Sequence, residues 1–178
     1  METIKVKIKK LVDNAVIPSY AHEGDMGMDL TAIGVEYNTE KDCYIYHTGL
    51  AVEIPQGYGM LLFPRSSNRN TNAYMTNHVG VIDSGYRGEI LVCFKNRNSS
   101  YLINIVNKAA FAINSILNRI GMKNLQVPLN SKELEFPYQV GDRIAQVVII
   151  PYPIVEYVEA DKLSETERGK GGHGSTGK

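Results

Sequence analysis

Residues 77–89 read Asn-His-Val-Gly-Val-Ile-Asp-Ser-Gly-Tyr-Arg-Gly-Glu. Apolar Val81 and Ile82 run directly into an aspartate and a glycine-containing turn, so the segment predicts a β-hairpin with Asp83 at a strand end and Tyr86 just past the bend. The backbone of such a hairpin can hydrogen-bond a flat ring edge-on, and a tyrosine can pack against a sugar. The alternative role for Asp83 is structural, as a side chain that caps a tight turn.

Other parts of the chain also have the two-residue period of β-strands. Ile4, Val6 and Ile8 alternate with lysines, which is typical of a strand with one buried face. Short apolar runs bounded by Gly, Pro or Asn predict further strands at residues 50–54, 60–63, 89–94, 143–150 and 154–158. Many short strands without interleaved helices predict an all-β sandwich, jelly roll or barrel.

One segment has the period of a helix instead. Its apolar residues recur at a spacing of three and four, at Val106, Ala109, Ala110, Ile113, Ile116, Leu117 and Ile120. Gly121 follows where a helix stop is expected. We therefore expect an amphipathic helix over residues 105–120, with one side buried in this chain or against another.

The end of the chain has a different composition. Residues 167–178 read Glu-Arg-Gly-Lys-Gly-Gly-His-Gly-Ser-Thr-Gly-Lys, with no apolar side chain to pack in a core. Arg168, the glycine amides and the hydroxyls of Ser175 and Thr176 have the composition of a polyphosphate clamp. The alternative is a frayed polar terminus.

Composition argues against several classes of protein. The 178 residues are 43% hydrophobic, enough for one sizeable core. Nineteen Lys and Arg balance nineteen Asp and Glu, so no basic excess favours nucleic acid. The apolar runs are too short to cross a bilayer, and Cys43 and Cys93 lack a paired spacing. We expect a cytoplasmic protein that binds neither nucleic acid nor membranes.

Five short motifs resemble, in the same order, those of the trimeric dUTPases (deoxyuridine triphosphate nucleotidohydrolases). They lie at residues 27–30, 64–67, 80–88, 141–146 and 168–177. The resemblance implies an all-β, dUTPase-like jelly roll (β-clip) with an inserted α-helical segment and a flexible glycine-rich C-terminal arm. The expected divisions are a β domain over 1–164, an insertion over 98–138 that is typical of some phage members, and a nucleotide-closing arm over 165–178.

The resemblance also implies an activity. The chain is expected to be a dUTP diphosphatase, in which water attacks the α-phosphorus with Mg²⁺ present and releases dUMP and pyrophosphate. This reaction keeps uracil out of DNA and supplies dUMP for dTMP synthesis. Asp83 would be catalytic, ordering the attacking water. Tyr86 would lie under the deoxyribose where a 2′-hydroxyl would clash, and Asn77 would read the uracil edge.

The remaining implied roles concern the phosphates and the assembly. Asp29 would contact the Mg²⁺ shell through water, with the ion held mainly by the triphosphate. The arm would close over the terminal phosphate with His173 stacked on the base, in a homotrimer with shared active sites, located in the host cytoplasm if the chain is viral. The full expected substrate-binding set is Arg65, Ser66, Ser67, Asn77, Gly80, Val81, Ile82, Tyr86, Gln146, Arg168, His173, Gly174, Ser175 and Thr176.

Three positions depart from the family pattern and leave alternatives open. His173 stands where Phe is usual, Ser67 where Gly is common, and Gly85 where a second Asp is common. The last two changes also resemble dCTP deaminase, which has the same fold. Deaminases carry a glutamate on the strand after the hairpin, and an ungapped alignment puts Cys93 there, which favours the hydrolase. The alternatives are a dCTP deaminase or bifunctional deaminase and dUTPase, and a regulatory protein of this fold that binds a partner through the inserted helix.

Overall fold

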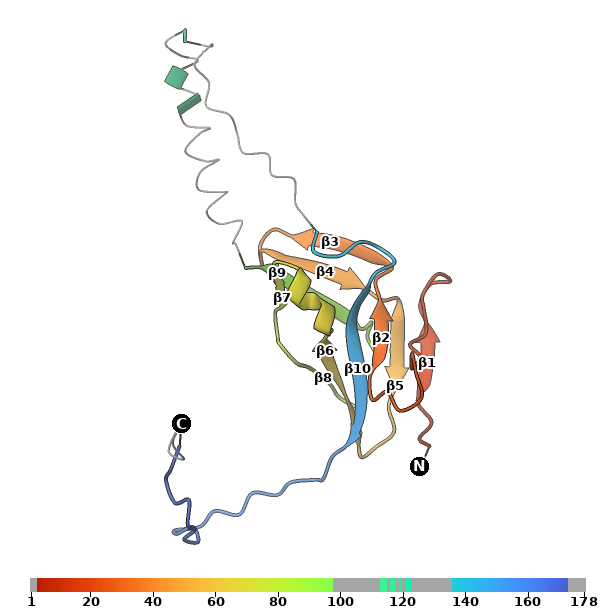
Figure 1. Cartoon of the computed structure of the whole chain (residues 1–178), viewed down its shortest axis with the longest axis vertical. Helices are drawn as coiled ribbons and strands as arrows, with labels where there is room; N and C mark the ends of the chain where they lie inside the picture. The colour runs from red at the N-terminus through yellow and green to blue at the C-terminus, as the bar shows by residue number, and fades with distance from the viewer. Residues whose placement is uncertain are drawn as a thin grey trace.

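The computed structural model describes residues 3–97, 113, 114, 116, 117, 119, 121, 122 and 136–172 (Figure 1). Apart from a few helical positions between 113 and 119, the regular elements in those residues are ten β-strands and one short 3₁₀ helix, which confirms the predicted all-β class. Within the same residues, no helix has both the length and the apolar character that a membrane crossing requires.

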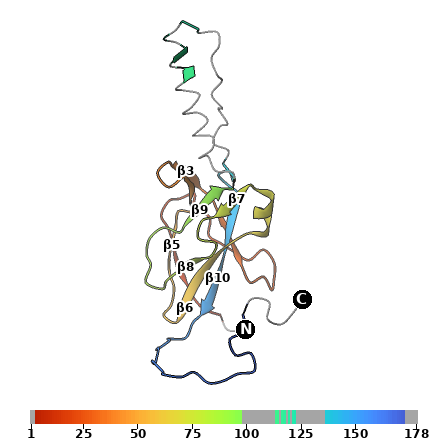
Figure 2. The ribbon, with the colours of Figure 1, turned by 90° about the vertical axis from the view of Figure 1, so that its left-hand side faces the viewer.

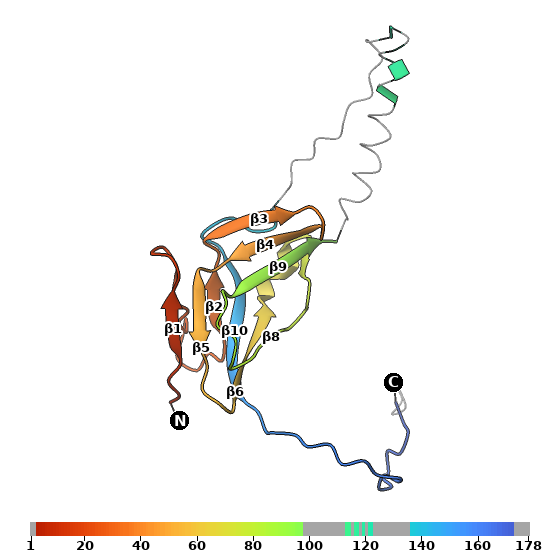
Figure 3. The same ribbon diagram turned by 180° about the vertical axis from the view of Figure 1, so that it is seen from behind.

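Two four-stranded antiparallel sheets and a two-stranded ribbon make up the body (Figures 1 and 3). The first sheet has the order β2 (Met28–Thr31), β10 (Arg143–Pro151), β6 (Tyr58–Pro64) and β8 (Gly80–Ile82). The second has the order β3 (Gly34–Asn38), β4 (Cys43–His47), β9 (Leu91–Asn96) and β7 (Ala73–Met75). The ribbon pairs β1 (Lys7–Lys10) with β5 (Leu50–Glu53), and the 3₁₀ helix η1 (Ser66–Asn70) follows β6.

One hydrophobic core joins the two four-stranded sheets. Alternate residues of β6 are buried, as the two-residue period requires, so that Met60 and Leu62 face the core. Tyr46 of β4 and Phe94 of β9 pack edge to face, with ring centroids 5.7 Å apart. Because this core fixes the strands on both sides of the 77–89 segment, it also fixes where that segment lies.

Most predicted strands are confirmed, with boundaries that shift by a few residues. The runs at 50–54, 60–63 and 143–150 correspond to β5, β6 and β10. The N-terminal alternation begins its ladder only at Lys7, and β9 begins at Leu91 rather than at Glu89. The delay in β9 has a cause in the structure, since the Ile90 amide already donates to the Leu50 carbonyl at 2.8 Å.

The strand predicted at residues 154–158 is wrong. This segment follows β10 as an extended stretch that leaves the body, and its residues are exposed (Figure 2). Ile154 is 96% exposed and Tyr157 is 94% exposed. A β-strand needs a neighbour for its backbone hydrogen bonds, and the described part of this chain offers none to this segment.

The hairpin predicted at residues 77–89 is also wrong in its pairing. β8 pairs with β6, whereas β9 pairs with β4 and β7, so the two flanking strands belong to different sheets. The turn itself forms as expected, with the Tyr86 amide donating to the Asp83 carbonyl at 3.0 Å. The apolar pattern and the turn residues were correct signals, but they do not specify which strands pair.

The predicted helix over 105–120 falls mostly outside the described residues. Those described at 113, 114, 116, 117 and 119 are helical. Gly121 has a left-handed φ of +77°, and the Met122 amide donates to the Leu117 carbonyl at 2.9 Å. A glycine in this conformation with this bond is the usual end of a helix. The helix as a whole, and the insertion over 98–138 that contains it, stay predictions.

A buried pair of tyrosines ties the start of β10 to the second sheet. The Tyr46 hydroxyl donates to the Tyr138 carbonyl and accepts from the Tyr138 amide, both at 3.0 Å. Burial raises the pKa of Tyr46 to about 12. The Tyr138 hydroxyl in turn donates to Asn68 Oδ1 at 2.9 Å, which connects this pair to η1.

The raised pKa of Tyr46 predicts a loss of stability at alkaline pH. In the unfolded chain the phenol titrates near its ordinary pKa of about 10, so the folded state is favoured fully below that pH and progressively less as pH rises toward 12. Urea unfolding at pH 8, 10 and 11.5 measures this loss. Tyr46→Phe should cost about 1–3 kcal/mol at pH 8, because the Tyr138 amide loses its acceptor, yet should lose less additional stability above pH 10.

Tyr152→Phe is the matched control, since Tyr152 is 45% exposed. It should follow the parent at every pH. A Tyr46→Phe variant that loses stability above pH 10 as steeply as the parent would contradict the assignment of this loss to the buried phenol.

Candidate active site

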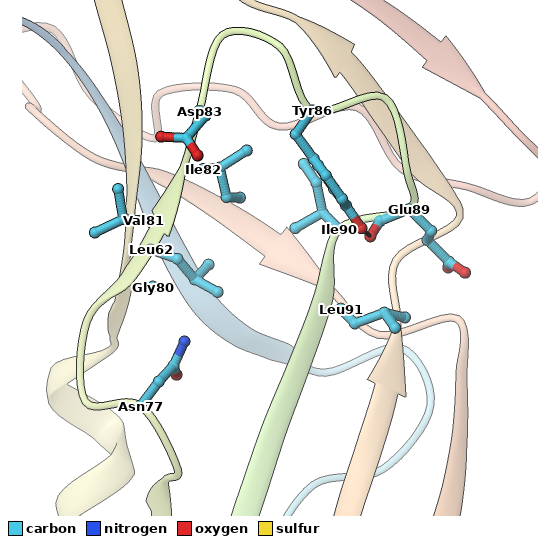
Figure 4. Close-up of a pocket in the computed structure, with 10 residues that line it drawn as sticks. All are labelled: Leu62, Asn77, Gly80, Val81, Ile82, Asp83, Tyr86, Glu89, Ile90 and Leu91. Atoms are coloured by element: carbon cyan, nitrogen blue, oxygen red, sulfur yellow. Dashed lines mark hydrogen bonds between the residues drawn. The ribbon is translucent and has the colours of Figure 1, made fainter.

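A pocket lies between β8 and β9, at the turn that joins them (Figure 4). It brings together six of the residues predicted from the third motif and the residues before it. Its described lining is Leu62, Asn77, Gly80, Val81, Ile82, Asp83, Tyr86, Glu89, Ile90 and Leu91. The pocket exists because β8 and β9 are in different sheets, which keeps their backbones apart at the turn.

β8 is an edge strand and presents its backbone to this pocket. It pairs with β6 along one edge, and no described strand pairs with its other edge. A Cβ atom on Gly80 would lie 3.1 Å from Asn77 Nδ2, so the glycine lets the Asn77 amide approach the strand closely. His78 adopts a left-handed φ of +55° in the tight turn that leads into β8. Free backbone groups and a side-chain amide can together read the polar edge of a flat ring.

Tyr86 is held across the turn from Asp83 (Figure 4). Its hydroxyl donates to the Glu89 carbonyl at 2.9 Å. A Cβ atom on Gly88 would lie 2.4 Å from the Tyr86 hydroxyl oxygen and 2.6 Å from the ring, so the ring lies directly against this glycine. The ring therefore has a fixed place at the wall of the pocket.

Asp83 follows the last residue of β8 and is exposed. Within the described part of the chain, no hydrogen bond or ion pair occupies its carboxylate. A carboxylate in this state can accept a hydrogen bond from water and then a proton. The capping role considered from the sequence is therefore not the one that its side chain has here.

A second cluster joins Asp29, predicted to contact the metal shell, with Arg65 and Ser67, predicted to bind substrate. Asp29 Oδ1 accepts from Arg65 Nε at 2.7 Å, and Asp29 Oδ2 accepts from Arg143 Nη1 at 3.1 Å. Arg65 Nη1 also donates to the Ser67 hydroxyl at 3.1 Å. Two guanidinium groups around one carboxylate leave a net positive charge, which suits an anion.

Gln146 belongs to the same cluster through strand pairing. β10 lies between β2 and β6, so that Gln146 is opposite both Asp29 and Phe63. Its Nε2 donates to the Pro64 carbonyl at 3.3 Å. A Cβ atom on Gly27 would lie 2.9 Å from Gln146 Oε1, so this glycine leaves room for the amide.

The two clusters lie at opposite ends of β6. Ile82 at the end of β8 is opposite Met60, whereas Ala145 beside Gln146 is opposite Pro64. Four residues of a strand span about 13 Å. Within one chain, the Asp83 carboxylate is therefore too far from Arg65, Ser66 and Ser67 to act on the same phosphate group.

The described part of the arm, residues 165–172, lies apart from the strands that carry both clusters (Figure 1). Arg168 is exposed, and its Nε donates to the Gly171 carbonyl at 3.1 Å. The other predicted arm residues, His173, Gly174, Ser175 and Thr176, lie outside the described residues. Their roles stay predictions.

The side chains around Asp29 suit a magnesium ion that binds together with substrate phosphates better than an ion held by the protein alone. No group of three His, Cys, Asp or Glu side chains able to hold a metal is present in the described residues. Asp29 is the carboxylate of the phosphate cluster, and arginines occupy both of its oxygens. Mg²⁺ commonly binds through one or two carboxylates, substrate phosphates and water, so the donor set fits an indirect contact from Asp29.

Sequence reasoning missed a group of residues behind Tyr86. Glu89 lines the pocket wall, but its carboxylate accepts from the Gly49 amide at 2.7 Å and contacts His47 Nδ1 at 3.1 Å. These partners are about 40 positions away in the chain, and only the pairing of β4 with β9 brings them close. The sequence has no local signal for such a contact.

Comparison with known proteins identifies the family. A family model described as dUTPase matches residues 13–112 and 119–177. The deoxyuridine 5′-triphosphate nucleotidohydrolase of Picosynechococcus is 34% identical over 173 residues, which are 97% of this chain and 98% of the relative. That of Clostridium tetani is 34% identical over 179 residues and the full length of both chains.

A solved structure agrees with this result. The dUTPase of Staphylococcus bacteriophage 80alpha with dUPNHPP has a TM-score of 0.69 and 26% identity, over 98% of this chain and 99% of that one. Together with the full-length relatives, this similarity shows that the chain belongs to the dUTPase family.

Proposed function

We propose that Asp83 aligns the water with which this dUTP diphosphatase hydrolyses dUTP to dUMP and pyrophosphate. The supporting observation is the unoccupied carboxylate of Asp83 at the end of an edge strand whose backbone lines a pocket. The water oxygen forms a bond to the α-phosphorus while the bond from that phosphorus to the bridging oxygen breaks. The water proton passes to the carboxylate, and the bridging oxygen leaves with pyrophosphate.

The pocket would select the nucleoside. The free edge of β8 and the Asn77 amide have the donors and acceptors needed to pair with the uracil edge. Tyr86 would lie under the deoxyribose, where its fixed ring leaves no room for a 2′-hydroxyl. A rigid wall discriminates better than a mobile one, because the larger sugar cannot displace it at low cost.

The cluster around Arg65 would bind the triphosphate. Arg65, Ser66, Ser67 and Gln146 offer a guanidinium, hydroxyl groups and an amide to phosphate oxygens. The cofactor is Mg²⁺, which neutralises negative charge on the phosphates when bound, and Asp29 would hold it through water. The dUTPase of phage phi11 is described with a structural Mg(II) ion.

A homotrimer with shared active sites would reunite the two clusters. Since Asp83 and Arg65 lie at opposite ends of β6, a complete site needs the Arg65 cluster of another copy. The arm over 165–178 would close over a neighbouring pocket, with Arg168, Ser175 and Thr176 on the terminal phosphate and His173 on the base. The exposed apolar residues after β10 support this assembly, because they need a partner surface.

The deaminase alternative has little support. Cys93 lies on β9 opposite Ile45 and is not among the residues that line the pocket. Glu89 lines the pocket, but the Gly49 amide and His47 already occupy its carboxylate. We therefore favour the hydrolase alone over a dCTP deaminase or a bifunctional enzyme.

A second function, binding of a protein partner through the insertion at 98–138, has one specific observation in its favour. The family model leaves residues 113–118 unmatched, and these six positions fall inside the helix predicted over 105–120. Among the structurally similar proteins, the phage 80alpha dUTPase is described as controlling transfer of virulence genes. A regulatory contact of this kind would be made in addition to catalysis.

Replacement of the proposed catalytic carboxylate tests the mechanism. Asp83→Asn should lower kcat for dUTP by about 10²–10⁴-fold, because the amide cannot accept the proton of water. Pyrophosphate release measures kcat, and calorimetric binding of a nonhydrolysable dUTP analogue checks that the pocket still binds. A variant that turns over dUTP as fast as its parent would overturn the role of Asp83.

Two glycines of the same turn form a matched pair for the sugar wall. Gly88→Ala should displace the Tyr86 ring and lower the ratio of kcat/KM for dUTP to that for UTP by about tenfold or more. Gly85→Ala should leave the ratio near that of the parent, because no atom lies within 4 Å of the added methyl. An unchanged ratio in Gly88→Ala would argue against Tyr86 as the sugar wall.

Truncation before Arg168 tests the arm. Removal of residues 168–178 should reduce turnover of dUTP at least about tenfold while the thermal midpoint changes little, because residues 168–170 are exposed and make no contact with the core. Steady-state kinetics and a thermal melt give the two readings. Normal kinetics in the truncated protein would exclude a closing role.

A further inference from the structure

The end of the 83–88 turn is anchored to the connection between β4 and β5. The Ile90 amide donates to the Leu50 carbonyl at 2.8 Å, and the buried Thr48 hydroxyl donates to the Ile90 carbonyl at 2.7 Å. One position earlier, the Glu89 carboxylate accepts from the Gly49 amide through Oε1 and contacts His47 through Oε2. Backbone and side-chain contacts thus fix two consecutive residues.

The connection that provides this anchor is tightly packed. Gly49 has a left-handed φ of +65°, and a Cβ atom there would lie 2.5 Å from Ile33 Cδ1 and 2.8 Å from Val12 Cγ2. Its carbonyl accepts from the Leu11 amide at 2.7 Å. Because a packed and hydrogen-bonded turn holds the Gly49 amide in place, that amide gives Glu89 a fixed partner.

The anchor reaches the pocket through one atom. The Glu89 carbonyl, which belongs to the residue held by its own carboxylate, accepts from the Tyr86 hydroxyl at 2.9 Å. Figure 4 shows the Tyr86 ring extending toward Glu89, while the Glu89 carboxylate points away from the pocket. The side chain of Glu89 is 25% exposed, so its contacts are partly shielded from water. Hydrogen bonds to a charged group are among the stronger ones, and partial burial strengthens them further.

We propose that Glu89 is a positioning residue for sugar selection, holding the Tyr86 ring through its own carbonyl while Gly49 and His47 hold its carboxylate. This inference rests on the proposed role of Tyr86 as the sugar wall. Loss of the carboxylate would leave the Glu89 carbonyl held only through its own peptide unit, whose Ile90 amide donates to Leu50. The Tyr86 hydroxyl that donates to this carbonyl could then shift, which would make room for a ribose. Asp83, whose carboxylate has no part in these contacts, would keep its chemistry.

The experiment compares kcat and KM for dUTP and UTP in full-length variants. Glu89→Ala should lower the dUTP to UTP ratio of kcat/KM by about tenfold, mostly through faster use of UTP, while kcat for dUTP falls less than about threefold. Glu89→Gln keeps an acceptor oxygen for the Gly49 amide and should restore most of the ratio. Glu53→Ala removes a carboxylate of β5 that pairs with Lys7 of β1, and this variant should leave the ratio unchanged.

A double variant separates positioning through Tyr86 from a general loosening of the pocket. Tyr86→Phe removes the hydroxyl that donates a hydrogen bond to the Glu89 carbonyl. The double variant Tyr86→Phe, Glu89→Ala should therefore be no less selective for dUTP over UTP than the less selective of the two single variants. Fully multiplicative effects would overturn the proposal. Should Glu89→Ala fail to fold, Glu89→Asp is the substitute, because a shorter side chain cannot reach both partners.

Tyr86→Ala separates the role of Tyr86 from that of Glu89. If Tyr86→Ala lowers the ratio and the Glu89 variants do not, the positioning role of Glu89 is wrong and the sugar wall stands. If Tyr86→Ala leaves the ratio unchanged, both the sugar wall and the positioning role are wrong.

Discussion

The pairing of β6 with β8 on one edge and with β10 on the other is the constraint on which the active site depends. β8 ends beside the first half of β6 and delivers Asp83 there, while β10 delivers Gln146 beside the far end. Arg65 comes directly after β6, and Asp29 lies on β2, which pairs with β10. One strand therefore sets the distance between Asp83 and the cluster around Arg65, and that distance is too large for one chain to close.

Features that depend on a few consecutive residues could be read from the sequence. The turn at Asp83–Tyr86, the glycines around it and the long apolar run of β10 appear in the structure much as expected. The resemblance predicted phosphate roles for Arg65 and Gln146 and a metal contact for Asp29, and the structure brings these three residues close together. The register of the strands explains this proximity. It brings Arg65 and Arg143, which are 36 and 114 positions from Asp29 in the chain, against the Asp29 carboxylate.

Features that depend on which strands become neighbours could not be read in this way. A short apolar, β-branched segment such as 154–158 looks the same whether or not a partner strand is present, and in the described chain it has none. The 77–89 segment has the residues of a hairpin, but the core places its two strands in different sheets. The contact of Glu89 with Gly49 and His47 likewise arises only from the folding of β4 against β9.

The apolar residues that follow β10 have a thermodynamic consequence. Ile154, Tyr157 and Leu163 expose most of their surface to water in a single chain. Burial of such surface between copies would favour association, and ligand-like mass action would then link the folded state to protein concentration. Dilution would weaken the fold as well as the assembly, so the melting temperature of this enzyme would fall as the protein concentration is lowered.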